Sequence, residues 1–222
     1  MPASYFDVDG TLVKTNLVHP TLYYVLHQRS PFRSFLKLAE TAVRTPRLVL
    51  AELQDRRLFN EALFYAFEGM SQDRLHALSD EVFDRVMKPA LFPAAKDLIA
   101  RCKGEGHEVV IVSGALDFLM EHLREYLGAD TVIANRLEYK HGIATGKLLR
   151  PVVAGPEKAK PLREPAQENG RDPAGRFGYP DGYSDVPMLS VVGHPAAVNP
   201  DGRLERLAKT YGWPVLSLNK NG

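Results

Sequence analysis

The first apolar run of the chain is short, and it ends on two carboxylates. Residues 4–8 are rich in β-prone side chains, and Asp7 and Asp9 stand two positions apart before Gly10 breaks the run. Side chains two apart on a strand point to the same side, so both carboxylates begin on one face. The pattern therefore predicts a strand with two acidic groups at its carboxyl end and a turn at Gly10 that places Asp9 beyond Asp7.

This acidic strand end has several interpretations. A calcium loop needs glycine at its sixth position and glutamate at its twelfth; Leu12 and Val18 stand there, which excludes it. A plain turn is consistent with Asp-x-Asp-Gly. A nucleophile with an acid/base group beside it, or two oxygen ligands for Mg²⁺, is also consistent. The stretch alone leaves the turn and the chemical site open.

Residues 16–88 show helical rather than strand-like periodicity. Pro31 and Pro46 each follow a Ser or Thr and are typical of the first turn of a helix. A further helix should end at Gly69, and Ser71 predicts the N-cap of another that continues to about residue 86. The apolar stripe of the helix before Gly69 consists of Phe59, Leu63 and Phe67. We expect this block to be all-α.

From residue 89 onward, helical and strand-like segments alternate. Helices are predicted over 94–103, from 114 to 127 and from 156, with strands over 108–112, 131–134, 176–179, 190–198 and 214–218, and a hairpin over 137–149. Such alternation predicts an α/β fold built on a doubly wound parallel sheet. Ligands of these sheets bind beyond the carboxyl ends of the strands.

The composition is that of an ordinary soluble enzyme-sized domain. The 222 residues are 45% hydrophobic and 25% charged, with a net charge of +1, so nothing indicates a nucleic-acid surface. The single cysteine, Cys102, excludes an internal disulfide and a multi-cysteine zinc site. We see neither a signal peptide nor a run of about 20 apolar residues that could span a membrane. We therefore expect a cytoplasmic protein.

One stretch of the helical block is basic and amphipathic. Its cationic residues outnumber its acidic ones, and apolar residues are interleaved between them. A solvated helical face over a small core is the interpretation we favour. The alternative is weak peripheral contact with anionic lipid, or with a lipid-like substrate. The basic residues are Arg29, Arg33, Lys37, Arg44 and Arg47.

Further polar residues follow the predicted strands. Ser113 comes directly after the most apolar strand, where its hydroxyl could cap the next helix or face a phosphate oxygen. Lys158 stands at a helix start after a glycine and is a better candidate than Lys160. Asp181 and Asp185 provide a second pair of carboxylates at a strand end, as a metal site would need.

The order of these motifs resembles the haloacid dehalogenase superfamily of phosphatases. The motifs are Asp7-x-Asp9-Gly-Thr, Ser113-Gly, Gly-x-x-Lys158 and Asp181-x-x-x-Asp185-x-Pro-Met. The most similar branch contains the phosphoserine phosphatases, which carry a helical cap inserted just after the first motif. The resemblance implies a Rossmann-like core over 1–15 and 89–222 and a cap over 16–88.

The resemblance also implies a mechanism. Asp7 would attack phosphorus and form an aspartyl-phosphate, and Asp9 would act as general acid and base. Mg²⁺ would be held by Asp7, the backbone carbonyl of Asp9 and Asp181, with Asp185 fixing the waters of the metal or orienting Lys158. Thr11 would brace the loop. The phosphate oxygens would be held by Gly10, Ser113, Gly114 and Lys158.

Two residues depart from the family pattern. Asn16 stands where phosphoserine phosphatases carry a cap glutamate that meets the substrate amino group, which disfavours phosphoserine as substrate. Pro180 replaces the glycine usual before the metal-binding aspartate, and its fixed φ could lower metal affinity. We therefore expect hydrolysis of a small or lipid-like phosphomonoester. A phosphate-binding or regulatory pseudoenzyme and a phosphotransferase are the alternatives, and the pattern does not predict the oligomeric state.

Overall fold

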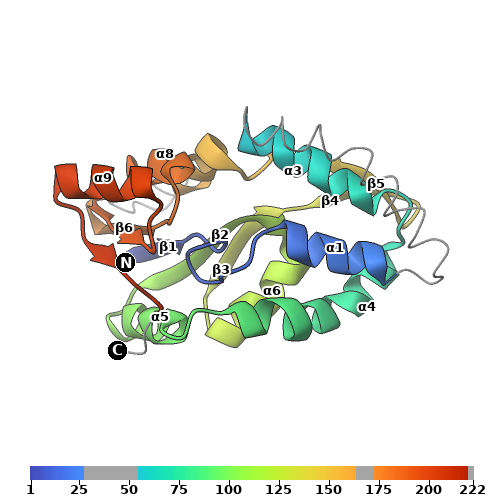
Figure 1. Ribbon diagram of the computed structural model, residues 1–222, viewed down its shortest axis with the longest axis horizontal. Coiled ribbons are helices and arrows are strands. Elements are labelled where there is room, and N and C mark those ends of the chain that lie inside the picture. Colours follow the sequence, from blue (N-terminus) through green and yellow to red (C-terminus); the bar gives the residue numbers. More distant parts are fainter. Residues whose placement is uncertain (28–54, 164–172, 220–222) are drawn as a thin grey trace.

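The central sheet has five strands in the order β3-β2-β1-β6-β7, and every neighbouring pair is parallel (Figure 1). The computed structural model describes residues 1–27, 55–163 and 173–219. This sheet confirms the predicted doubly wound α/β fold. Its strands are β1 (Ala3–Phe6), β2 (Glu108–Leu116), β3 (Thr131–Asn135), β6 (Arg176–Tyr179) and β7 (His194–Pro195).

Helices flank the sheet and occupy most of the described residues between β1 and β2. The α-helices that lie wholly within the described residues are α1 (Val18–Leu26), α3 (Arg56–Phe64), α4 (Gln72–Val82), α5 (Ala95–Gly104), α6 (Asp117–Leu127), α8 (Val186–Leu189) and α9 (Gly202–Tyr211). Shorter or tighter helical turns are η1 (Tyr65–Phe67), η2 (Phe83–Met87), η3 (Lys88–Ala90), η4 (Gly155–Ala159), η5 (Pro173–Gly175) and η6 (Tyr183–Asp185). Among the described residues, no helix is long and apolar enough to cross a membrane.

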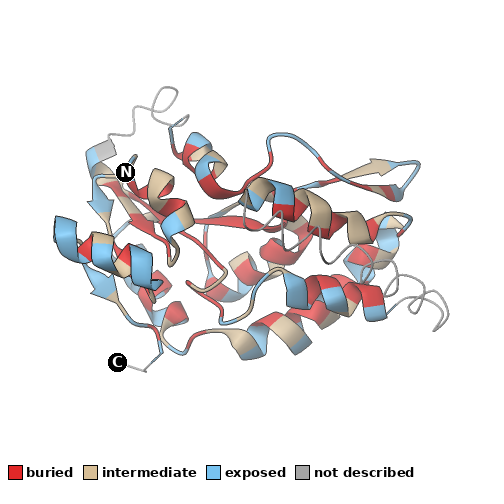
Figure 2. Cartoon of the chain, turned by 45° about the horizontal axis from the view of Figure 1, so that its top comes forward, coloured by how far each residue is buried: buried red, intermediate tan, exposed pale blue. Residues whose placement is uncertain are grey.

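Alternate residues of β1 bury themselves on opposite faces of the sheet. Phe6 belongs to the large core that also contains Ile99 of α5 and Leu123 of α6. Tyr5 belongs to a second cluster, which includes Met188 of α8. Buried positions accordingly concentrate in the sheet and along the inward sides of the helices (Figure 2). The two-residue period of a strand thus explains why both faces of the sheet are covered.

The predicted hairpin forms, and it joins the helical block. Strands β4 (Leu137–Lys140) and β5 (Ile143–Leu148) are antiparallel. Ala144 donates its N–H to the carbonyl of Met70 at 2.8 Å and accepts from the N–H of Gly69 at 2.9 Å. Residues between η1 and α4 therefore continue the edge of this hairpin by backbone pairing. A segment from the second half of the chain is in this way tied to the helices that follow β1.

The structure corrects the predicted bounds of several strands and of one helix. Strand β2 continues through Gly114 to Leu116, so the following helix starts at Asp117 and not at residue 114. The predicted strand over 190–198 is reduced to β7 and β8 (Ala197–Val198), because α8 runs up to Leu189 and the N–H of Ser190 still donates to the carbonyl of Val186 at 2.9 Å. Strand β9 (Val215–Leu216) pairs with β8 in a separate two-stranded sheet.

Several predictions lie outside the described residues. The helices expected to begin at Pro31 and Pro46 fall in the range 28–54, and so does the basic amphipathic surface. The helices on either side of Gly69 are confirmed. Ser71 is the N-cap residue of α4, although its side chain makes no capping hydrogen bond.

Asp201 connects α9 to the loop that follows β6. Its carboxylate accepts from the N–H groups of Arg203 at 2.8 Å, Leu204 at 2.7 Å and Tyr183 at 2.8 Å, while its own N–H donates to the carbonyl of Asp181 at 2.8 Å. Burial would raise the pKa of Asp201, but the three N–H donors outweigh it and hold that pKa below its usual range. Asp201 is both the N-cap of a helix and a brace for the loop.

Replacing Asp201 with Ala should lower the free energy of unfolding by about 1–2 kcal/mol, the usual cost of losing an N-cap. Urea denaturation would measure the change. Glu205→Ala is the matched control, because Glu205 lies in the same helix and makes only an exposed ion pair with Lys209. Equal effects of the two substitutions would contradict the bracing role of Asp201.

Candidate active site

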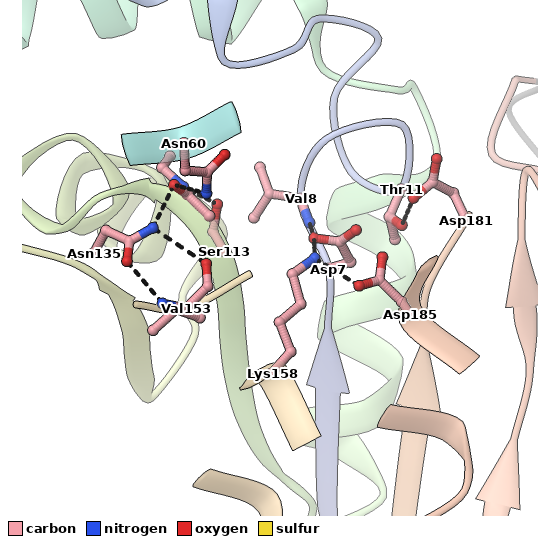
Figure 3. A network of polar contacts seen from close by, with 12 residues as sticks. Asp7, Val8, Thr11, Asn60, Ser113, Asn135, Val153, Lys158, Asp181 and Asp185 are labelled. Atoms are coloured by element: carbon pink, nitrogen blue, oxygen red, sulfur yellow. Dashed lines mark hydrogen bonds and ion pairs between the residues drawn. The ribbon is translucent and has the colours of Figure 1, made fainter. Parts of the chain in front are cut away.

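Asp7 lies directly after β1, at the centre of the carboxyl edge of the sheet (Figure 3). Its N–H donates to the carbonyl of Tyr179 at 3.2 Å, which ties it to the neighbouring strand β6. One carboxylate oxygen, Oδ1, accepts from the N–H of Val8 at 2.7 Å and from Lys158 Nζ at 2.8 Å. The side chain is buried, so these contacts fix the orientation of the carboxylate.

Lys158 is the buried cation of the site. It lies in η4, and its ammonium group pairs with Asp7 at 2.8 Å and with Asp185 at 3.1 Å. Burial alone would lower the pKa of Lys158, but the two carboxylates outweigh burial and raise it, so the side chain stays charged. Lys160 is exposed and pairs with Glu157. The fold thus brings Lys158, and not Lys160, to the carboxylates.

Asp181 and Asp185 join Asp7 from the loop after β6. One oxygen of each of the three carboxylates lies within 4.8 Å of the others. Burial raises the pKa of Asp181 to about 8, and the charges of Asp7 and Asp185 act in the same direction. Burial raises the pKa of Asp185 to about 7 despite the opposing charge of Lys158. The pKa of Asp7 is instead lowered, because Lys158 outweighs the effect of burial.

The chemistry of this cluster fits a hard divalent cation. All three groups offer carboxylate oxygens, the ligand type that Mg²⁺ and Ca²⁺ prefer. Lys158 supplies one positive charge to balance three acidic groups, and burial, together with repulsion from the neighbouring carboxylates, raises the pKa values of Asp181 and Asp185. A bound cation would relieve that repulsion.

Gly10 makes the approach of Asp181 possible. Its φ is +81°, a left-handed conformation that favours glycine, and a Cβ atom there would collide with Oδ2 of Asp181. Thr11 Oγ1 donates to Oδ1 of Asp181 at 3.3 Å, which links the loop after β1 to the loop after β6. Asp9 is partly buried, and burial together with the charge of Asp7 raises its pKa to about 7.

Gly10→Ala should remove cation binding and activity, because the new methyl group displaces Asp181 from the carboxylate cluster. Gly69→Ala is a matched control: Gly69 has a φ of +80°, but a Cβ atom there meets nothing within 4 Å. Both substitutions carry the same backbone strain, of order 1 kcal/mol. Calorimetric Mg²⁺ titration of the two variants should therefore show loss of binding in the first only. Retained binding in Gly10→Ala would contradict the collision argument.

Ser113 and Gly114 lie on β2, not at a helix N-terminus. The N-cap interpretation of Ser113 is wrong, because β2 continues and α6 starts four residues later. The buried hydroxyl of Ser113 instead accepts from the N–H of Ala115 at 3.0 Å, and it keeps its own proton to donate. The carbonyl of Gly114 accepts from Asn135 Nδ2 at 2.7 Å and from Asn60 Nδ2 at 3.2 Å.

A polar pocket brings four of the eight predicted site residues together. Its volume is about 300 Å³, including the part open to solvent. Ser113 and Gly10 are not among its lining residues, and Asp181 and Asp185 lie on the other side of Asp7. The lining residues are Asp7, Asp9, Leu17, Arg56, Asn60, Gly114, Ala154, Gly155 and Lys158.

Sequence reasoning missed Arg56 and Asn60. Both lie on α3, four residues apart and therefore on one face, and both line the polar pocket. The positive charge of Arg56 lowers the pKa of Asp9, although burial and Asp7 outweigh it. The signal that the sequence offers for them is two polar residues four positions apart, beside the apolar stripe of the same helix. Nothing local shows that this face meets the carboxyl edge of the sheet.

The two residues that depart from the family pattern are both described. Asn16 is exposed and precedes Leu17, the N-cap residue of α1; its Oδ1 accepts from the N–H of Val18 at 3.0 Å and lies 3.1 Å from Nδ1 of His19. Pro180 is buried, and its carbonyl accepts from the N–H of Val198 at 2.8 Å. Asp181 reaches the carboxylate cluster with this proline before it.

Comparison with known proteins identifies the class of protein to which this fold and site belong. The model of the haloacid dehalogenase-like hydrolase family matches residues 5–190. The chain therefore belongs to the haloacid dehalogenase-like hydrolases, which confirms the resemblance of its motifs.

Individual relatives support this placement. The chain is 31% identical to the inhibition of morphological differentiation protein of Streptomyces azureus, over 98% of this chain and 79% of that protein. It is 28% identical to phosphoserine phosphatase SerB1 of Mycobacterium tuberculosis, over 96% of this chain and 70% of the relative. A substrate-bound phosphoserine phosphatase structure has the same fold, with a TM-score of 0.71, 19% identity, and coverage of 99% of this chain and 93% of that one.

Proposed function

We propose that this protein is a Mg²⁺-dependent phosphatase that hydrolyses a phosphomonoester through an aspartyl-phosphate on Asp7. The observation that carries the proposal is the buried Asp7 carboxylate, which is paired with Lys158 and clustered with Asp181 and Asp185. A purely structural role would not require four ionisable side chains to converge where burial penalises their charge. The names of the phosphatase relatives point to the same reaction class.

The reaction has two steps. An oxygen of Asp7 attacks phosphorus, the bond from phosphorus to the leaving oxygen breaks, and Asp9 gives that oxygen a proton. In the second step Asp9 takes a proton from a water that attacks phosphorus. The bond between phosphorus and the Asp7 oxygen then breaks, which releases phosphate and restores the carboxylate. Because its pKa lies near 7, Asp9 can be protonated in one step and ionised in the other.

The remaining site residues hold the phosphate and the cation. Lys158, the Ser113 hydroxyl and the N–H groups near Gly10 and Gly114 would hold the phosphate oxygens as charge spreads over them. Mg²⁺ would be held by Asp7, Asp181 and the backbone carbonyl of Asp9. Asp185 would fix the waters of the metal or orient Lys158. When bound, the cation neutralises charge on the nucleophile and on the phosphate.

The domain division is part of the same proposal. Residues 1–15 and 89–222 would form the catalytic core, and residues 16–88 the cap that selects the substrate. Arg56 and Asn60 support this role, because they are contributed by the helical segment and line the pocket beside Asp7. The hairpin β4–β5, although part of the core segment in sequence, would move with the cap to which it is hydrogen-bonded.

The deciding experiment is the hydrolysis of p-nitrophenyl phosphate with Mg²⁺ and with EDTA. We expect turnover with Mg²⁺ that disappears on chelation and returns when the metal is restored. No turnover at any Mg²⁺ concentration, from a protein that binds Mg²⁺ in a calorimetric titration, would refute the proposed hydrolase. Failure to bind Mg²⁺ would instead point to a pseudoenzyme weakened at Pro180.

A further inference from the structure

An apolar chamber lies beside the polar pocket. The space that it encloses is narrow in this structure, and part of it opens to solvent. Asp9 is the one charged residue that lines it in the described part of the chain. Its walls combine residues of the helical block with residues of the β2–α6 segment. Six of the apolar residues are Leu17, Pro20, Tyr24, Phe67, Met87 and Phe118.

Asp9 and Leu17 are the two residues shared by the apolar chamber and the polar pocket. Asp7 and Lys158 line the polar pocket and not the chamber. A phosphate held against Asp7 would therefore have its leaving oxygen at Asp9, the proposed acid. The group carried by that oxygen would lie on the far side of Asp9, which is the apolar chamber.

A second opening leads away from the polar pocket but does not pass Asp9. It is a wider cleft that shares Arg56 and Gly155 with the polar pocket and continues to Tyr183 and Pro187. A group bound there would emerge from the phosphate on the side of Arg56, away from the acid. The leaving oxygen would then lack its proton donor. The position of Asp9 thus favours the chamber.

The chamber is poorly suited to a charged leaving group. An ammonium or carboxylate placed there would lose its hydration against aliphatic and aromatic side chains, at a cost of several kcal/mol. Thr21, a polar residue of the wall, already donates its hydroxyl to the carbonyl of Leu17 at 2.8 Å. Asn16, in place of an acidic residue, is uncharged and exposed, and its Oδ1 accepts from the N–H of Val18 at 3.0 Å.

On this basis we infer that the physiological substrate is the phosphate ester of an apolar alcohol, whose hydrocarbon or aromatic part occupies the chamber between α1, η1 and α6. The inference rests on the proposed phosphatase function and names its substrate class. It makes the chamber wall, and not a charged contact, the main determinant of specificity.

The test compares kcat/KM for benzyl phosphate, methyl phosphate and O-phospho-L-serine with the wild-type chain. We expect benzyl phosphate to exceed both others by at least about tenfold, since each methylene in an apolar pocket contributes about 1–3 kcal/mol. Thr21→Leu should narrow the chamber and lower the ratio of benzyl to methyl phosphate about tenfold. Thr210→Leu is the control, because Thr210 makes the same hydrogen bond to a carbonyl four residues earlier, on α9.

A second variant tests the same inference independently, in case Thr21→Leu does not fold. Met87→Ala widens the chamber and should shift the preference toward a larger ester, such as 2-naphthylmethyl phosphate. Higher kcat/KM for phosphoserine than for benzyl phosphate, or an unchanged substrate ratio in both variants, would overturn the inference while leaving the phosphatase intact. Absence of turnover on all esters would overturn the proposed function and this inference with it.

Discussion

Asp7→Asn should reduce kcat by at least about 10³-fold, because an amide cannot act as the carboxylate nucleophile. The fold should tolerate the change. Asn keeps an oxygen that can accept from Val8 and Lys158, and the ammonium group of Lys158 retains its partner Asp185. The measurement is the initial rate of phosphate release with Mg²⁺, together with a urea denaturation curve for the same preparation.

Asp73→Asn is the matched control for this substitution. Asp73 lies in the first turn of α4 and is exposed, so its replacement should leave the rate unchanged. A folded Asp7→Asn protein that turns over at the wild-type rate would remove Asp7 from the chemistry. A loss of activity that coincides with unfolding would require the result to be repeated at a lower temperature, where the variant is folded.

Lys158→Met should affect activity and stability together. The ammonium group pairs with two buried carboxylates, and methionine fills similar volume without the charge. Removing one partner of a buried ion pair typically costs about 3–5 kcal/mol, because the other partner is left uncompensated. We therefore expect a loss of about 3 kcal/mol in the free energy of unfolding, measured in EDTA, and no detectable turnover.

Lys160→Met separates this effect from a general loss of positive charge. Lys160 is two residues away and exposed, and its ion pair with Glu157 should contribute less than about 1 kcal/mol. The variant should keep both its stability and its turnover. Equal losses in the two lysine variants would contradict the assignment of Lys158 as the cation of the site.

Much of the site could be predicted from the sequence because it depends on strand ends. Asp7 follows β1 and Asp181 follows β6, and these strands are parallel neighbours in the sheet. Once the alternation of helices and strands predicts a parallel sheet, the residues after its strands must gather at one edge. Lys158 could be preferred over Lys160 for a local reason, the glycine that precedes its helical turn.

The remaining features depend on contacts between distant segments. Asn60 reaches Gly114 across 54 positions of the chain, and no local pattern encodes that approach. Likewise, Met70 pairs with Ala144 only because the helical block and the hairpin lie side by side. The start of α6 was misplaced because Ser113-Gly114 has the composition of a strand-to-helix break, whereas backbone pairing carries β2 on to Leu116, opposite Asn135.

The aspartyl-phosphate can be tested most directly by acid quenching during turnover. The wild-type chain would be mixed with Mg²⁺ and benzyl phosphate, quenched in acid at successive times, digested and analysed by mass spectrometry. We expect one phosphoryl group on the peptide that contains Asp7, absent in EDTA and lost once the substrate is consumed. Continued release of phosphate while the Asp7 peptide stays unmodified at every time would contradict it.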